Sequence, residues 1–214
     1  YNTIFTRIGM KNFISVQSDS GMMGGKVAHE FMALTPDGED ELVVCSHCDY
    51  RANIEVAQCQ TEKIDGNSTS ACESVFTSTC KTIEELSNYL KVESTDIIKA
   101  VVYADKTTGE PVLVFLRGDL EVNETKLQKI LQREIAPLNS ESNPLLCFGN
   151  IGPSSDLPVK TVIYDKSIEG RCDMVVGANK DGYHKIHFNV GRDIVVDGFY
   201  DIANVKAGQK CVKC

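Results

Sequence analysis

Apolar positions along the chain gather in short runs, and a few stretches have helical spacing instead. Apolar runs typical of strands lie at 13–18, 27–34, 41–45, 96–104, 112–119, 160–165, 172–179 and 184–190. Helical spacing is found at 1–10, 49–59, 82–92 and 121–135. The strands come in hairpin-like pairs with helices between them. This order predicts an α/β fold with a mixed, largely antiparallel sheet and flanking helices.

Local signals refine two of these helices and two connecting segments. Thr82 and Glu85, three residues later, form a capping box, so we expect a helix to begin there. Asp49 is the candidate N-cap for the helix over 49–59. Residues 61–76 are rich in Ser, Thr, Gly and Asn and predict a loop, and the tail from 198 onward has loop composition as well.

Composition excludes two broad classes of function. Hydrophobic residues make up 42% of the 214 residues, which is enough for one medium domain with its own core. No apolar run reaches the ~20 residues that a membrane-spanning helix needs, so we expect no membrane partner. The formal net charge is -8. A domain this acidic is a poor nucleic-acid binder on its own, because phosphate contacts need a surplus of Lys and Arg.

Four of the nine cysteines form two CxxC pairs. The spacing of Cys45 with Cys48, and of Cys211 with Cys214, is that of two halves of a four-cysteine structural zinc site. Such a site requires the two ends of the domain to meet. Reduced thiols without a metal, or a redox pair, are the alternatives, although neither pair has a thioredoxin-like context. The other cysteines share no spacing, and we expect small buried hydrophobes or loop thiols in a reducing cytosol.

Three further features are candidates for a catalytic or binding site. Lys99 interrupts an apolar strand, where a charged side chain must reach solvent, pair with a carboxylate or serve a site. His184 and His187 are three residues apart on the last strand, so their side chains should lie on opposite faces. The loop at 149–153, Gly-Asn-Ile-Gly-Pro, could bring backbone N–H groups close to a carbonyl oxygen. The ordinary alternatives are a Lys stem along a strand end, a satisfied core histidine and a plain turn.

Six segments, in a fixed order, go beyond these single motifs. They are GG-x-x-x-HEF at 24–31, DY-x-ANIE at 49–55, TIEEL at 82–86, RGD-x-E-x-NE-x-KL at 117–127, GANKDGYH at 177–184 and KCVKC at 210–214. In this combination the chain resembles, over nearly its whole length, the insertion (editing) domain of bacterial prolyl-tRNA synthetase. Its fold then resembles that of the free-standing aminoacyl-tRNA deacylases.

The resemblance implies a hydrolytic editing activity inside a cytoplasmic proline–tRNA ligase. A site built for proline cannot strongly reject the smaller alanine, so a second site hydrolyses the ester of mischarged alanyl-tRNA(Pro) with a positioned water. Editing then needs no cofactor, whereas ATP and Mg belong to the aminoacylation step of the parent enzyme. The implied partners are the acceptor end of tRNA(Pro) carrying alanine and the rest of the synthetase chain, which is expected to form a homodimer.

The resemblance also implies how the chain is divided. Residues 1–14 are expected to be a segment of the synthetase core, 15–197 the editing domain, and 198–214 a return segment to the core with its CxxC pair. The core outside this chain would then supply most of the phosphate contacts that a net charge of -8 disfavours.

The family's catalytic and pocket residues carry over one at a time. Its essential lysine matches Lys99, which would anchor a phosphate of the terminal adenosine or orient the ester. Its Gly-x-x-x-Pro loop runs here from Gly149 through Gly152 to Pro153, and the loop N–H groups would stabilise the oxyanion. Its pocket histidine matches His184, which would shape the amino-acid site.

Three more positions match substrate-binding positions of the family: Asp49, Thr77 and Asp165. At one of them the chain departs from the family pattern, because many members have Thr-Pro-Gly where this chain has Thr77-Ser78-Thr79.

Other functions of the same fold remain open at this point. A former editing domain could act only as a tRNA-binding module, or as a structural insert with an inactive pocket. A free-standing deacylase is a third alternative. The absent initial Met, the first helix without a start and the terminal CxxC favour an excised insert.

Overall fold

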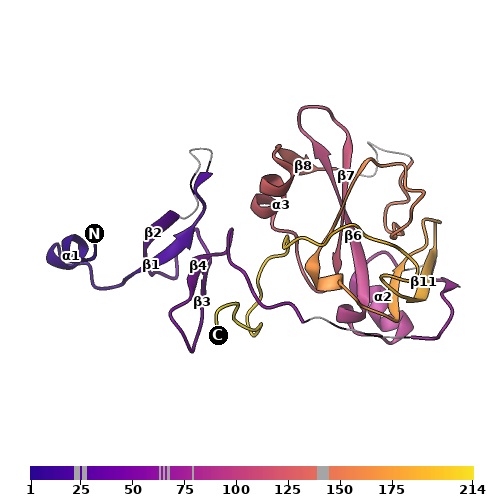
Figure 1. Ribbon diagram of the computed structural model, residues 1–214, viewed down its shortest axis with the longest axis horizontal. Helices are drawn as coiled ribbons and strands as arrows, with labels where there is room; N and C mark the ends of the chain where they lie inside the picture. Colours follow the sequence, from indigo (N-terminus) through magenta and orange to yellow (C-terminus); the bar gives the residue numbers. More distant parts are fainter. Residues whose placement is uncertain are drawn as a thin grey trace. The chain divides into compact units, whose positions relative to one another are not determined.

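The computed structural model describes residues 1–21, 25, 28–62, 64, 66, 68–78, 80–138 and 145–214 (Figure 1). Gly24 of the GG-x-x-x-HEF motif and Thr79 of the Thr-Ser-Thr segment lie outside the described residues.

The chain forms two compact units, and each is described by itself. Unit 1 comprises Tyr1–Gln60 and Asn204–Cys214, and unit 2 comprises Thr61–Ala203. The boundaries expected at 14/15 and 197/198 concern the origin of each segment in a longer enzyme, and they stay a prediction.

Unit 1 is built on a small four-stranded sheet. Its elements are helix α1 (Asn2–Arg7) and strands β1 (Phe13–Ser18), β2 (Ala28–Ala33), β3 (Leu42–Val44) and β4 (Arg51–Asn53). The strand order is β2-β1-β4-β3, in which β1 and β4 are parallel and the other neighbours antiparallel. The helix expected at the start of the chain and the strands at β1, β2 and β3 are therefore confirmed.

The helix predicted over 49–59 is wrong, because β4 and a turn occupy this segment. The apolar positions Ala52, Ile54 and Val56 are spaced by two, which is the period of a strand rather than of a helix. Pairing of β4 with β1 on one side and with β3 on the other fixes the extended conformation. Asp49 therefore does not cap a helix.

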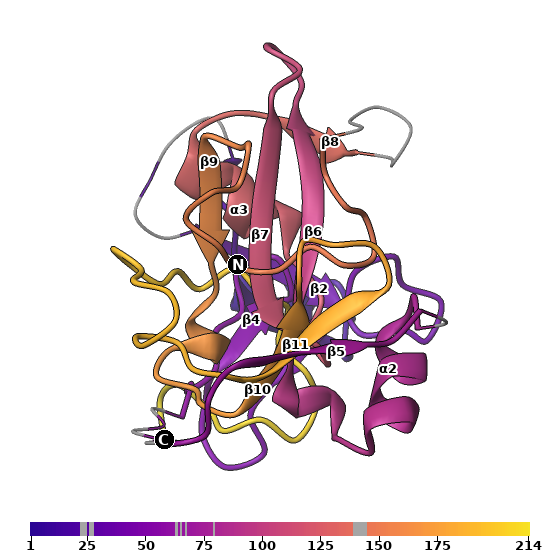
Figure 2. The same ribbon diagram turned by 90° about the vertical axis from the view of Figure 1, so that its right-hand side faces the viewer.

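Unit 2 is built on a seven-stranded mixed sheet (Figure 2). Its strands are β5 (Glu73–Phe76), β6 (Ile97–Asp105), β7 (Pro111–Arg117), β8 (Ile135–Pro137), β9 (Thr161–Tyr164), β10 (Met174–Gly177) and β11 (Tyr183–Phe188). Its helices are α2 (Ile83–Leu90) and α3 (Glu124–Leu131), with the 3-10 turns η2 (Ser94–Asp96) and η4 (Lys166–Ile168). The sheet order is β5-β11-β10-β6-β7-β9, and β8 also pairs with β6.

Figure 2 shows the long β6–β7 hairpin with β9 beside β7. The β6–β10 and β7–β9 pairs are parallel, whereas the other pairs of this sheet are antiparallel. The predicted fold class, a mixed and largely antiparallel α/β arrangement, is confirmed.

The loop predicted over 61–76 is only partly correct, because its last four residues form β5. Two of these four residues are polar, so the segment carries only a weak apolar strand signal. They form a strand because β11 supplies their hydrogen-bond partners. The two strands pair in antiparallel register from Glu73↔Ile186 to Phe76↔Tyr183. Such long-range pairing overrides local composition.

Buried apolar residues fill both faces of the unit 2 sheet. On β7, Leu113 and Phe115 pack into the cluster on one face, while Val112 and Val114 pack into the cluster on the other. The second cluster includes Leu127 of α3, so we call this side the helix face. Alternation along buried strands thus places successive side chains in two separate cores.

Candidate functional site

A pocket of about 470 Å³ lies in unit 2 between the start of α2, strand β6 and the loop at 148–151. It brings together three of the predicted site residues: Lys99 from β6, Gly149 from the loop and His184 from β11. Much of the remaining lining is apolar and includes Ile83, Leu86, Val101, Leu138 and Phe148. The pocket is therefore an apolar recess with a few polar groups, which is typical of small-molecule sites.

Lys99 lies on the helix face of β6. Its neighbours at alternate positions, Ile97 and Val101, pack into clusters with residues of α2 and α3. The Lys99 Nζ atom donates to Glu121 Oε1 at 2.7 Å, and the Glu121 side chain is 72% exposed. An ion pair with so open a carboxylate contributes only about 0.2–1 kcal/mol. The Lys99 ammonium group can therefore exchange Glu121 for an anionic group of a substrate at little cost in free energy.

His184 is a buried histidine, and burial lowers its pKa below the usual value of 6.5. It is therefore neutral near pH 7. His187, on the same strand, has a half-exposed side chain and places its Nδ1 atom 3.2 Å from Asp173 Oδ1. The two histidines have separate surroundings, as their spacing predicts.

The hydrogen-bond partners of His184 favour one of its two tautomers. Its Nδ1 atom lies 2.6 Å from Thr77 Oγ1 and 3.5 Å from Asn150 Nδ2. The Asn150 amide orientation is set by two other bonds, since Oδ1 accepts from Gly182 N–H and Nδ2 donates to the Tyr183 carbonyl. An amide nitrogen can only donate, so we assign Nδ1 as the acceptor and Nε2 as the protonated atom. His184 thus offers one N–H donor.

Gly149 is open to the pocket. Its φ of +87° lies in the left-handed region that favours glycine, and a Cβ there would meet nothing within 4 Å. No described residue accepts a hydrogen bond from its N–H group. This N–H is therefore available to a ligand oxygen.

Gly152 has a different role from Gly149. Its N–H donates to Asn179 Oδ1 at 2.9 Å, and its carbonyl accepts from Asn179 Nδ2 at 3.0 Å. A Cβ at this position would overlap the carbonyl oxygen of Gly177. Gly152 does not line the pocket, and it lets the loop lie directly against β10.

The other predicted substrate-binding residues lie outside the pocket lining. Thr77 contacts His184, which lines the pocket, but it does not line the pocket itself. Pro153 is buried at the end of the loop. Asp165 is buried, and its carboxylate accepts from the N–H groups of Ser167 and Ile202.

Asp49 belongs to unit 1, where its carboxylate accepts a hydrogen bond from Lys213 Nζ at 2.7 Å. In unit 2, Asp165 caps the 3-10 turn η4 through its bond from Ser167. The structure thus gives both carboxylates local structural partners.

Asn150 is the positioning residue that sequence reasoning missed. It is buried between the two glycines of the loop, and it bonds to Gly182 at the end of the β10–β11 connection and to the first two residues of β11. Its own carbonyl accepts from the Asn179 N–H at 2.8 Å. A buried amide with all its groups paired holds a loop in one position. The sequence signal was only an Asn inside a glycine-rich loop.

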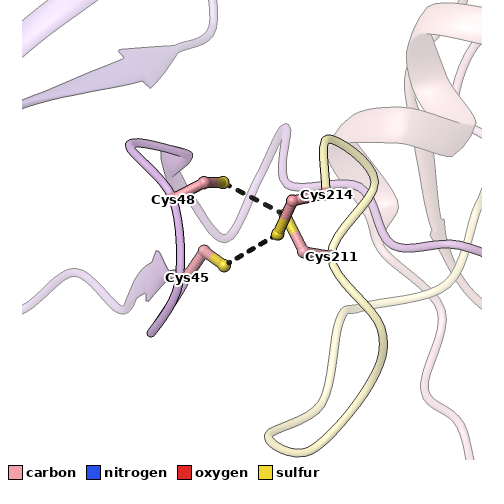
Figure 3. A group of neighbouring side chains, drawn as sticks. All are labelled: Cys45, Cys48, Cys211 and Cys214. Carbon is pink, nitrogen blue, oxygen red and sulfur yellow. Dashed lines mark hydrogen bonds between the residues drawn. The ribbon is translucent and has the colours of Figure 1, made fainter.

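The four cysteines of the two CxxC pairs meet in unit 1 (Figure 3). The sulfur atoms of Cys45, Cys48, Cys211 and Cys214 all lie within 4.8 Å of one another. They are the group of candidate metal ligands found in the described part of the chain.

Comparison with known families identifies the class of this protein. Residues 77–193 match the aminoacyl-tRNA editing domain family, and this span lies within unit 2. The match covers more than half of the chain, so the chain belongs to that family. It begins at Thr77 and includes Lys99, Gly149 and His184. Within the described residues, no helix has the length and apolar character that crossing a membrane requires.

The particular relatives are bacterial proline–tRNA ligases. The chain is 38% identical over 218 residues to the enzyme of Halothermothrix orenii and 37% identical over 219 residues to that of Brachyspira hyodysenteriae. Each match covers 100% of this chain but only 38% of the relative. The chain therefore spans well under half the length of the curated relatives it matches.

One solved structure supports the fold alone. It is described as epitope backbone grafting by computational design for improved presentation of linear epitopes on scaffold proteins. The TM-score is 0.52 at 14% identity, and the match covers 63% of this chain and 88% of that chain.

Proposed function

We propose that unit 2 hydrolyses the ester between alanine and the terminal adenosine of tRNA(Pro), within a cytoplasmic proline–tRNA ligase. The observation that carries the proposal is the convergence of Lys99, Gly149 and His184 on one pocket. They come from three separate segments of a chain that belongs to the aminoacyl-tRNA editing domain family. The similarity to proline–tRNA ligases supports the choice of tRNA.

The pocket offers the groups that ester hydrolysis needs. An ester requires a positioned water and stabilisation of the tetrahedral oxyanion, and it requires little acid help for its leaving group. Gly149 lines the pocket and its N–H has no hydrogen-bond partner among the described residues, so we assign this N–H to the oxyanion. His184, being neutral, donates its Nε2–H to an oxygen of the substrate. No side-chain nucleophile or cofactor is required by this scheme.

Lys99 supplies the positive charge for the nucleic acid. The chain has a net charge of -8, so its affinity for tRNA phosphates must be local rather than general. Lys99 is 15% exposed at the pocket, and it pairs with the exposed carboxylate of Glu121. We assign it to a phosphate of the terminal adenosine. The apolar lining from α2, Ile83 and Leu86, suits an apolar amino acid such as alanine.

The ligation activity belongs to the rest of the enzyme in this proposal. The chain matches 38% of the length of its relatives, so the ATP- and Mg-dependent attachment of proline is assigned to the remainder. That remainder would also carry most of the contacts to the acceptor stem.

Deacylation of alanyl-tRNA(Pro) and prolyl-tRNA(Pro) by the full chain tests the proposal. Wild-type protein should hydrolyse the alanyl ester and spare the prolyl ester, and Lys99→Ala should lower kcat/KM by about 100-fold. Lys106→Ala is the matched control, because Lys106 also pairs with an exposed carboxylate, Glu134, but lies outside the pocket lining. It should stay within about twofold of wild type.

Deacylation, measured together with tRNA binding, separates the alternatives. Binding of tRNA without hydrolysis would identify a tRNA-binding module, and absence of both would identify a structural insert. Equal rates for Lys99→Ala and wild type would remove the role assigned to Lys99.

A further inference from the structure

The two CxxC turns of unit 1 lie far apart in the sequence and adjacent in space. Cys45 faces Cys214, 169 residues away, and Cys48 faces Cys211, 163 residues away. Figure 3 shows the four side chains pointing toward a common centre from two facing turns. One turn follows β3, and the other ends the segment from Asn204. The two chain segments that make up unit 1 thus meet at these sulfurs.

The distances between the sulfurs fit a metal ion better than disulfides. The Sγ atoms of Cys45 and Cys214 are 3.6 Å apart, and those of Cys48 and Cys211 are 3.7 Å apart. A disulfide needs about 2.05 Å. A tetrahedron with zinc–sulfur bonds of about 2.3 Å has sulfur–sulfur edges of about 3.8 Å. All four sulfurs lie within 4.8 Å, so a small inward shift completes the tetrahedron.

Backbone N–H groups point at three of these sulfurs. His47 N–H donates to Cys45 Sγ at 3.3 Å, and Tyr50 N–H donates to Cys48 Sγ at 3.4 Å. Lys213 N–H repeats the pattern on Cys211 at 3.3 Å. In each case the donor is two residues after the cysteine. Hydrogen bonds of this kind stabilise thiolates and orient them as metal ligands.

Unit 1 also has few fully buried apolar residues to hold it together without a metal. Its buried hydrophobic residues are Val16, Ala52 and Ala57, counted over the described residues. The three clusters of buried apolar residues found in the described chain consist of unit 2 residues. Small units with so little buried apolar surface are usually stabilised by disulfides or a structural metal.

We propose that Cys45, Cys48, Cys211 and Cys214 bind one structural zinc ion that joins the β3–β4 region of unit 1 to the segment from Asn204. Four thiolates complete the tetrahedral shell and leave no position for water or substrate, so the ion is structural and takes no part in hydrolysis. Binding displaces the four thiol protons and forms four zinc–sulfur bonds, with no change of oxidation state. The proposal is independent of the editing reaction assigned to unit 2.

Metal analysis of the full chain, purified without chelators and without a metal-affinity tag, is the first test. We expect about one zinc and no iron per chain. Cys45→Ser and Cys211→Ser should each lose the zinc. Cys59→Ser is the matched control, because Cys59 is a half-buried thiol of the same unit that lies outside the four-sulfur group. It should keep the zinc.

Replacement of zinc by cobalt keeps the test valid if a variant fails to fold. The wild-type chain, stripped by a chelator and reloaded with Co²⁺, should show the visible absorption of a tetrahedral cobalt–thiolate centre, and added zinc should remove it. Zinc removal should also speed amide hydrogen exchange in β3 and β4 more than in β6 and β7. Iron in place of zinc, two disulfides by mass, or metal-free protein with unchanged exchange would each overturn the proposal.

Discussion

The Thr77 Oγ1 atom and the His184 Nδ1 atom lie 2.6 Å apart in the interior of unit 2. Thr77 follows β5, and His184 lies on β11, the strand to which β5 is paired. The contact holds the imidazole ring from the side opposite to its Nε2–H. Thr77, which sequence comparison suggests as a substrate-binding residue, therefore acts in this structure as a positioning residue for His184.

Thr77→Val should lower deacylation without removing the fold. The substitution keeps the shape and deletes the hydroxyl, so the buried Nδ1 atom loses its closest partner at a cost of about 1–3 kcal/mol. We expect kcat to fall by about tenfold or more, with a smaller change in KM. Steady-state kinetics on alanyl-tRNA(Pro) measure both.

The matched control for that substitution is Thr161→Val. Thr161 accepts a hydrogen bond from Arg133 at 2.9 Å and lies on β9, outside the pocket lining. It should lose a similar amount of stability and keep wild-type kinetics. If both variants lost activity in parallel with stability, the positioning role of Thr77 would be wrong.

Stability should fall as the pH is lowered from about 7 to about 5. Burial holds the pKa of His184 below 6.5, whereas the unfolded chain titrates near that value. The unfolded state therefore binds the proton first. The contribution of neutral His184 is fully present above the unfolded pKa and is lost as pH falls through the folded pKa. Urea denaturation at a series of pH values measures the slope.

Two variants isolate the histidine responsible for this slope. His184→Gln removes the buried imidazole and should flatten the dependence of unfolding free energy on pH in this range. His187→Gln changes a half-exposed histidine of the same strand and should keep the wild-type slope. Identical slopes in wild type and His184→Gln would contradict the assignment.

Glu121→Gln should strengthen the interaction of the pocket with tRNA. The Lys99 Nζ atom is 2.7 Å from the Glu121 carboxylate, which competes with a substrate phosphate for the same cation. Removing that charge frees the Lys99 cation and removes a repulsive anion near the substrate. We expect KM to fall by about two- to tenfold, with kcat within about twofold of wild type.

Glu134→Gln provides the comparison for that variant. Glu134 pairs with Lys106 at 3.2 Å, and neither residue lines the pocket. It removes the same charge from the same unit and should leave KM unchanged. An equal drop in KM for both variants would show a general charge effect rather than release of Lys99.

Much of the fold was predictable because local and tertiary preferences agree. Strands β6 and β7 are apolar on both faces, and the Thr82–Glu85 capping box forms at the start of α2 as expected. The parallel pairing of β6 with β10 and the position of β5 were not predictable, since each depends on a partner far along the chain. The error over 49–59 arose from reading alternate apolar residues as a helix face.

The site was predictable only in part, for a physical reason. Lys99 and His184 stand out because a cation in an apolar strand and a histidine after a turn are unusual, and the family resemblance implies a role for each of them. Asn150 carries no such signal, because an Asn in a glycine-rich loop looks the same in sequence whether it is buried or solvated. Only the folded chain shows that its amide joins the loop to β11.

The two glycines of the loop should respond differently to alanine. At Gly149 an added Cβ has free space, and the left-handed φ of +87° costs about 1–2 kcal/mol. At Gly152 the Cβ overlaps the backbone carbonyl of Gly177, and Gly152 itself cannot move away without breaking its two hydrogen bonds with the Asn179 side chain. Gly152→Ala should therefore lose about 1–3 kcal/mol or more.

Thermal denaturation and deacylation separate the two roles. Gly152→Ala should show a clearly lower melting temperature, with whatever activity remains following the folded fraction. Gly149→Ala should stay folded at the assay temperature and lose about tenfold or more in kcat, because the strained φ changes the direction of the N–H of this pocket-lining residue. The assignment of the Gly149 N–H to the oxyanion fails if Gly149→Ala is fully folded and fully active.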